Sequence, residues 1–160
     1  MRRDLRIALI TIIAAFALAI LPLPDWAAKL RPDWVTLALI YWAMALPSRI
    51  GVTFAWFAGV MLDVAHGAIL GQHAVGLVLV VYIVLLQHQR MRVASLLQQA
   101  LVVLALLLLK QLLVVWVNGI TGHPTGGWLA FAPSLIGALL WPWVYIVLRD
   151  LRRKFVYQAM

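Results

Sequence analysis

Hydrophobic residues fall into six long stretches along the chain, and polar residues gather in the short segments between them. A helix that crosses the hydrocarbon core of a bilayer needs about 20 predominantly apolar residues. The pattern predicts an all-α integral membrane protein, whose single domain over residues 1–160 forms a six-helix transmembrane bundle. The stretches cover approximately residues 5–21, 34–46, 51–65, 69–86, 96–117 and 128–148.

The first stretch follows a basic start formed by Arg2, Arg3 and Arg6, as the apolar core of a signal peptide would. Residues 26–28 bear a faint likeness to a cleavage region. The apolar core is longer than the roughly 7–15 residues of a typical signal sequence, and further apolar stretches follow it. We therefore expect residues 5–21 to be retained as a signal-anchor helix.

The second and third stretches are short and are separated only by residues 47–50. At about 1.5 Å per residue, the second is about 20 Å long, against a hydrocarbon core of about 30 Å. Two arrangements fit this length: a thin or tilted hairpin that crosses the bilayer, or a pair that re-enters without crossing. Both begin and end on the same side, so the topology of the other stretches is unchanged.

The composition excludes an ordinary soluble domain. Of the 160 residues, 66% are hydrophobic and 11% are charged, whereas a soluble domain carries about 25% charged residues. These charges are too few to cover a globule, so lipid must solvate part of the surface. The chain has no cysteine, which excludes disulfides, thiolate nucleophiles and cysteine-based metal or iron–sulfur sites.

The distribution of Lys and Arg predicts the orientation. The net charge is +8, but the 13 basic residues form short clusters between apolar stretches, which argues against a nucleic-acid-binding face. Basic residues favour the cytoplasmic side of a membrane. With the N-terminus inside, only Lys29 and Arg31 lie in periplasmic segments, and Lys110 lies within a helix. We therefore expect a multi-pass protein of a bacterial inner membrane with both termini in the cytoplasm. The cytoplasmic segments then hold Arg2, Arg3, Arg6, Arg49, Arg90, Arg92, Arg149, Arg152, Arg153 and Lys154.

Asp63 is the one acidic residue within a hydrophobic stretch. An ionisable side chain there costs at least ~2.5–3.5 kcal/mol unless it finds a partner or water. Gly59, Asp63 and Gly67 are spaced four apart, so they share one helical face on which small residues permit close approach of another helix. Asp63 is either a buried polar contact or the cap of a helix end near the interface. The helix that packs on this face belongs either to the bundle or to a partner protein.

Apart from Arg6 of the basic start, Lys110 is the only cation within the hydrophobic stretches, at a depth similar to that of Asp63. A buried ion pair between Asp63 and Lys110 would explain why both are tolerated. In the alternative, the long Lys110 side chain extends outward to the periplasmic headgroups. The sequence leaves both interpretations open.

Catalytic and metal-binding patterns are absent from the sequence. His66 and His73 lie near Asp63, but their spacing matches no zinc signature, so we expect polar loop residues and no metal site. The serines near membrane depth, Ser95 and Ser134, lack a Gly-x-Ser-x-Gly context and an attendant His. The chain also lacks a paired carboxylate set and a glycine-rich phosphate cradle. We therefore expect neither an enzyme nor a cofactor.

Four segments stand in a distinctive order and spacing. They are Arg31-Pro32-Asp33-Trp34, Gly59-Val60-Met61-Leu62-Asp63, Gly67-Ala68-Ile69-Leu70-Gly71 and Trp141-Pro142-Trp143. Through these segments, and essentially from end to end, the chain resembles the rod-shape-determining MreD family. The resemblance implies that the family's characteristic positions are Pro32, Gly59, Asp63, Gly67 and Gly71. Lys110 is not among them, so a pair with Asp63 would not be general to the family.

The resemblance implies a noncatalytic component of the cell-elongation complex, which builds lateral peptidoglycan and maintains rod shape. It also implies MreC as the main partner, with MreB, RodA and a class B transpeptidase in the same complex. The implied fold resembles the S component of energy-coupling-factor transporters. That analogy, together with Asp63, His66, Gln72 and His73, supports an alternative: a small-ligand-binding or transport component.

Overall fold

Helices account for nearly all of the described chain. The computed structural model describes residues 2–123 and 126–157. The predicted all-α class is confirmed for these residues, and the six apolar stretches correspond to α1 and α3 to α7. The elements are α1 (Arg2–Ile20), α2 (Asp25–Ala28), α3 (Trp34–Ala45), α4 (Val52–His66), α5 (Gln72–Val93), α6 (Leu96–Ile120), the 3-10 helix η1 (Gly127–Phe131) and α7 (Ala132–Tyr157).

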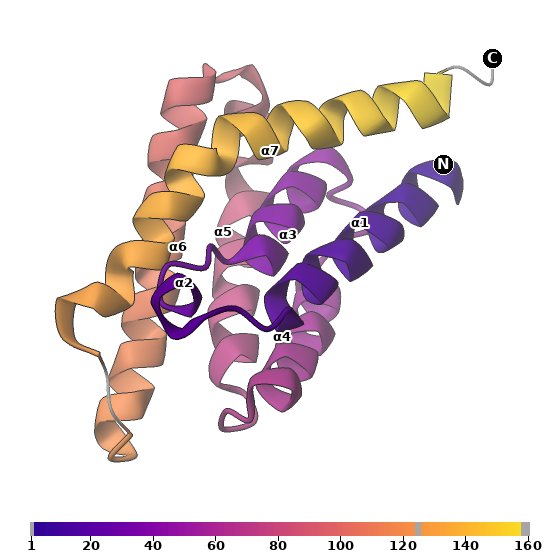
Figure 1. Ribbon diagram of the computed structural model, residues 1–160. Coiled ribbons are helices and arrows are strands. Elements are labelled where there is room, and N and C mark those ends of the chain that lie inside the picture. The colour runs from indigo at the N-terminus through magenta and orange to yellow at the C-terminus, as the bar shows by residue number, and fades with distance from the viewer. Residues whose placement is uncertain (1, 124–125, 158–160) are drawn as a thin grey trace.

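The helices pack into one bundle with two distinct ends (Figure 1). Both chain termini lie at one end, together with the α3–α4 and α5–α6 connections, and we call this the termini end. The α4–α5 connection and the end of α6 lie at the opposite end. This alternation is the one that the positions of the basic clusters predict.

Local signals set several of the helix boundaries. Ser95 begins α6 with a capping box, in which its hydroxyl accepts from the Gln98 backbone N–H and the Gln98 side chain accepts from the Ser95 N–H. Asp33 caps α3 by accepting from the Thr36 N–H at 3.3 Å. Gly67 ends α4 in the left-handed region (φ 62°), a conformation that glycine adopts without steric cost.

Helix α3 lies at the centre of the bundle. Every residue from Val35 to Met44 is buried, and the helix contacts α1, α5, α6 and α7. The Trp42 indole N–H donates to the Thr11 hydroxyl of α1 at 2.8 Å. Other helices therefore surround α3, so its short length need not match the thickness of the lipid.

Within the part of the chain that the structure describes, three helical segments are long and apolar enough to cross a membrane: Gln72–Val93, Leu96–Ile120 and Gly127–Phe155. Helices α3 and α4 are shorter, at 12 and 15 residues. The first turns of α1 hold Arg2, Arg3, Asp4 and Arg6, which shortens its apolar part. Length and composition thus support three crossings, and the six-span count stays a prediction.

Helix α7 bends across the termini end of the bundle. Its first half lies beside α6, and its second half crosses towards the start of α1 (Figure 1). Pro142 lies inside α7, where it lacks the N–H for the helical hydrogen bond and its ring crowds the preceding turn. Arg152 reaches Asp4 of α1, with Nε 3.2 Å from Oδ1. The bend and this contact bring the two ends of the chain together.

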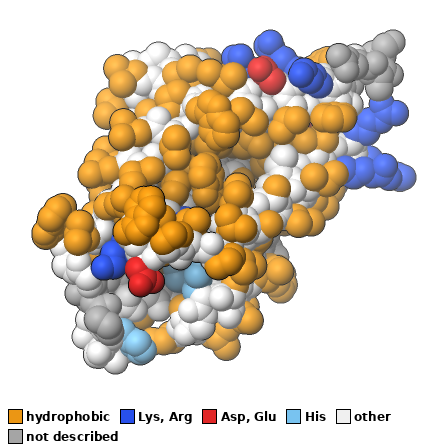
Figure 2. All heavy atoms as spheres, in the orientation of Figure 1, with side chains coloured by type: hydrophobic (Ala, Val, Ile, Leu, Met, Phe, Trp, Pro, Cys, Tyr) orange, Lys and Arg blue, Asp and Glu red, His pale blue; other side chains and the backbone are white. Residues whose placement is uncertain are grey.

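The exposed surface is largely hydrophobic. Figure 2 shows hydrophobic side chains over most of the visible face, with most of the visible Lys and Arg side chains near the two termini. Large apolar side chains are widely exposed, among them Val93 (87%) and Leu139 (81%). Apolar patches of this extent are rare on soluble monomers and fit contact with lipid.

Gly59 allows a close approach between α4 and α5. A Cβ on Gly59 would lie 2.2 Å from the Ala74 Cα and 2.7 Å from the Ala74 N, both backbone atoms of α5. Gly59 is buried in the α4–α5 contact, whereas Gly67 and Gly71 lie in the connection between these helices. The sequence left open whether the helix that packs on this face belongs to the bundle or to a partner protein. At Gly59 the packing helix is α5 of the same bundle.

We predict that Gly59→Ala destabilises the protein, because the added methyl must push the α5 backbone away, and such overpacking typically costs about 1–3 kcal/mol. Gly119→Ala is the matched control, since nothing lies within 4 Å of a Cβ at that helical position. The measurement is the free energy of unfolding in mixed micelles of a mild detergent and SDS. Equal stability of the two variants would contradict the close contact.

Candidate functional site

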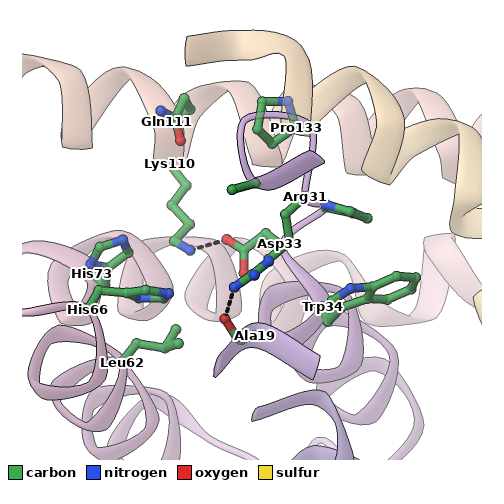
Figure 3. Close-up of a pocket in the computed structure, with 12 residues that line it drawn as sticks. Ala19, Arg31, Asp33, Trp34, Leu62, His66, His73, Lys110, Gln111 and Pro133 are labelled. Atoms are coloured by element: carbon green, nitrogen blue, oxygen red, sulfur yellow. Dashed lines mark hydrogen bonds and ion pairs between the residues drawn. The ribbon is translucent and has the colours of Figure 1, made fainter. Parts of the chain in front are cut away.

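A buried ion pair joins α6 to the start of α3. Lys110, which is 4% exposed, donates from Nζ to the Asp33 carboxylate and to the Thr36 hydroxyl at 2.9 Å (Figure 3). The Lys110 stem passes over Gly76 of α5, where a Cβ would lie 2.8 Å from the Lys110 Cγ. Because an isolated charge is costly inside a membrane protein, the carboxylate and the hydroxyl explain why a lysine is tolerated here.

Lys110 is paired with Asp33 in the structure, and neither of the two interpretations left open by the sequence, a pair with Asp63 or a side chain extended outward to the headgroups, includes this partner. The Lys110 ammonium is buried and binds Asp33. Asp33 looks like a loop residue in the sequence. The short helix α3 begins within the bundle, however, and this places its capping carboxylate beside α6.

Asp63 holds together the turn between α4 and α5. Its side chain is 0% exposed and accepts from the backbone N–H groups of Gly71 and His73, each at 2.8 Å. It also lies 2.8 Å from the His73 Nδ1. Both expectations for Asp63 thus describe part of its role: it is a buried polar contact, and it caps a helix end, but the helix is α5 rather than its own α4.

A pocket of about 360 Å³ opens beside the ion pair. We call it the polar pocket. Arg31 anchors one wall by donating to the carbonyls of Ala19 and Leu21 at the end of α1 (Figure 3). The Arg31 Nε is buried and has no hydrogen-bond partner in the protein. The lining residues are Ala19, Ala28, Arg31, Pro32, Asp33, Trp34, Leu62, His66, His73, Lys110, Gln111 and Pro133.

Two histidines separate the polar pocket from a second pocket of about 320 Å³. His66 ends α4 and His73 lies in the first turn of α5, with ring centroids 5.5 Å apart. In the second pocket, the Gln72 side-chain amide donates to the Asn118 side chain at 2.9 Å. Both pockets lie where the helices meet at the end opposite the termini.

The side chains that line these pockets can bind a polar group. Hydrogen-bond donors, an ion pair and imidazole rings line an open cavity. Among residues 2–123 and 126–157, no group of three or more His, Cys, Asp or Glu side chains could hold a metal ion. The arrangement suits recognition of a polar group or of a segment of another protein.

The characteristic positions separate into three roles. Pro32 lines the polar pocket, Gly59 packs in the core, and Asp63 and Gly71 belong to the α4–α5 turn with Gly67. Sequence reasoning missed four residues that build the site: Arg31, Asp33, Thr36 and Gly76. A signal existed for the ion pair itself, because Asp33 stands just before an apolar stretch, where a helix N-cap is expected.

We predict that Asp33→Asn lowers the free energy of unfolding, because it removes the carboxylate from a buried ammonium. Adding Lys110→Met should recover part of the loss, with a coupling free energy of about 1 kcal/mol or more in a double-mutant cycle. The matched cycle of Asp63→Asn with Lys110→Met should show the smaller coupling. A larger coupling for Asp63 would contradict the pairing.

Comparison with known proteins identifies the family. The chain matches the family described as rod shape-determining protein MreD over residues 1–151. It is 32% identical over 142 residues to the rod shape-determining protein MreD of Haemophilus influenzae, a match that covers 89% of this chain and 88% of that protein. No solved structure matches the chain, so the likeness to an energy-coupling-factor S component stays a prediction. The resemblance seen in the sequence is confirmed: the chain belongs to the rod shape-determining MreD family.

Proposed function

We propose that this protein is a noncatalytic inner-membrane component of the complex that synthesises lateral peptidoglycan, and that it maintains rod shape by docking MreC. MreB, RodA and a class B transpeptidase belong to the same proposed assembly. The name of the family supports a role in cell shape. The docking role goes further and rests on the polar pocket.

The polar pocket supports docking because its charged groups are fixed in advance. Lys110 and Asp33 hold each other, and Arg31 is tied to the end of α1. The fold already holds these donors in place. A partner that enters the pocket therefore loses little conformational entropy in ordering them, which favours binding. The half-buried Trp34 adds an aromatic surface of the kind enriched at binding hot spots.

A small-ligand-binding or transport role is the second candidate. The volume of the polar pocket, about 360 Å³, falls within the range of roughly 300–1,000 Å³ typical of small-molecule sites. Mass spectrometry on gently purified protein distinguishes the two. A small molecule that is bound at one copy per protein, and is no longer bound when a larger side chain fills the pocket, would favour this candidate over docking.

The proposed orientation puts the termini end in the cytoplasm. Figure 2 shows most of the visible Lys and Arg side chains near the termini, and basic residues favour the cytoplasmic side. Both termini and the α5–α6 connection are then cytoplasmic, and the polar pocket faces the periplasm.

We predict that a fusion at Gln89 places the reporter in the cytoplasm, where green fluorescent protein is fluorescent and alkaline phosphatase is inactive. A fusion at Gly122 should place the reporter in the periplasm, with the opposite result. Fusions at the two chain termini should behave like the one at Gln89. Paired green fluorescent protein and alkaline phosphatase fusions measure this. Phosphatase activity at Gln89 would contradict the proposed orientation.

We predict that a cysteine-reactive crosslinker attached at Gln111→Cys captures MreC in membranes. The chain has no cysteine of its own, so the label is unique. Ile120→Cys is the matched control, because Ile120 lies on the same helix, is 67% exposed and does not line the pocket. Capture of MreC at Ile120 but not at Gln111 would place docking elsewhere.

Filling the same pocket tests whether docking matters for shape. Gln111→Trp should give rounded cells and loss of MreC co-purification, while the protein still inserts at normal levels. Ile120→Trp should leave the cells as rods. Rods with MreC attached in the Gln111→Trp strain would overturn docking at this pocket.

A further inference from the structure

A second charged cavity lies at the termini end of the bundle, away from the polar pocket. Its volume is about 310 Å³, and we call it the arginine pocket. It forms where the end of α3 meets the end of α5 and the second half of α7. The lining residues are Tyr41, Met44, Ala45, Arg92, Tyr145, Arg149 and Arg152.

Arg92 is fixed in place by the end of α3. Its Nε donates to the Met44 carbonyl at 2.7 Å and its Nη2 donates to the Ala45 carbonyl at 3.0 Å. These carbonyls belong to the last turn of α3, where helical acceptors lack intrahelical partners. A guanidinium carries five N–H groups, so Arg92 keeps donors for a further acceptor.

Arg149 is the least satisfied of the three arginines. Its Nε is buried and makes no hydrogen bond, and the Asp150 Oδ1 lies 3.6 Å away, beyond hydrogen-bond range. The guanidinium carbon lies 5.9 Å from the centre of the Tyr145 ring, a cation–π contact that orients the group. A buried donor without an acceptor is unfavourable, so this site gains from a ligand that supplies one.

The pocket keeps a positive charge after its acidic neighbours are counted. Arg152 lies 3.2 Å from Asp4, and Arg149 lies near Asp150. Three guanidinium groups therefore face two carboxylates, and Asp150 is itself exposed to solvent. The surplus positive charge favours binding of a compact anion that carries several oxygen atoms.

We propose that the arginine pocket binds a phosphate group. Guanidinium groups match phosphate oxygens with paired hydrogen bonds, and Arg is the residue of choice for this recognition. The phosphate site rests on the orientation given with the proposed function. In that orientation, the pocket opens at the cytoplasmic membrane surface. Basic pockets between helices on that side bind the headgroups of anionic lipids. The phosphate thus comes either from such a headgroup or from a soluble phosphate.

The test uses the full chain in a mild detergent, titrated with phosphatidylglycerol and, separately, with zwitterionic phosphatidylcholine. Native mass spectrometry reads the lipid retained, and inorganic phosphate is the soluble competitor. Arg149→Gln should weaken retention of phosphatidylglycerol by about tenfold, the loss expected for one charge-assisted contact. Arg149→Lys keeps the charge and should lose less.

Arg153→Gln is the matched control, because Arg153 lies on the same helix, is exposed and does not line the pocket. Phosphatidylglycerol retention that depends on Arg149 but not on Arg153 supports a lipid headgroup. Displacement of that lipid by millimolar inorganic phosphate, with the same dependence on Arg149, supports a phosphate site supplied from solution. Equal losses in the Arg149 and Arg153 variants, or retention of neither phosphatidylglycerol nor inorganic phosphate, would overturn the proposal. Docking of MreC at the polar pocket is measured separately, so either inference can fail alone.

Discussion

Both ends of helix α3 lie inside the protein, and the rest of the structure depends on this constraint. Its 12 residues span only about 18 Å, and other helices surround it. Backbone groups at a helix end need partners, and lipid supplies none. At its start, Asp33 caps the helix and is paired with Lys110 of α6. At its end, Arg92 of α5 donates to the carbonyls of Met44 and Ala45. The backbone of one short helix thus explains the positions of two basic side chains, Lys110 and Arg92.

The same shortness leaves space at each end of α3. The polar pocket opens at its start, beside Asp33 and Trp34, and the arginine pocket opens at its end, beside Met44 and Ala45. Charged residues that stabilise the helix also line these cavities, so the fold presents fixed polar surfaces at both ends of an otherwise hydrophobic body. Each of the two proposed sites, one for a protein partner and one for a phosphate group, therefore lies at one end of α3.

The α4–α5 pair shows how a small-residue pattern serves the interior. Gly59 permits close contact with Ala74, and Asp63 binds the first turn of α5 across a connection that contains Gly67 and Gly71. The same residues, read in sequence, fit docking of a foreign helix equally well. A stripe of small residues signals close approach, but the identity of the approaching helix depends on where the chain turns back.

The sequence by itself determined the helical class, the apolar stretches, the basic clusters and the family, because each depends on residues near one another in the chain. The helix boundaries at Asp33, Ser95 and Gly67 also depend on neighbouring residues alone, because each residue caps the helix next to it in the chain. The partner of Lys110 was not: Asp33 is 77 positions away, and the choice between Asp33 and Asp63 depended on where α3 begins within the bundle. The bend of α7 and the gathering of Arg92, Arg149 and Arg152 around the end of α3 were likewise decided by the tertiary structure, because only packing brings the ends of three helices to one place.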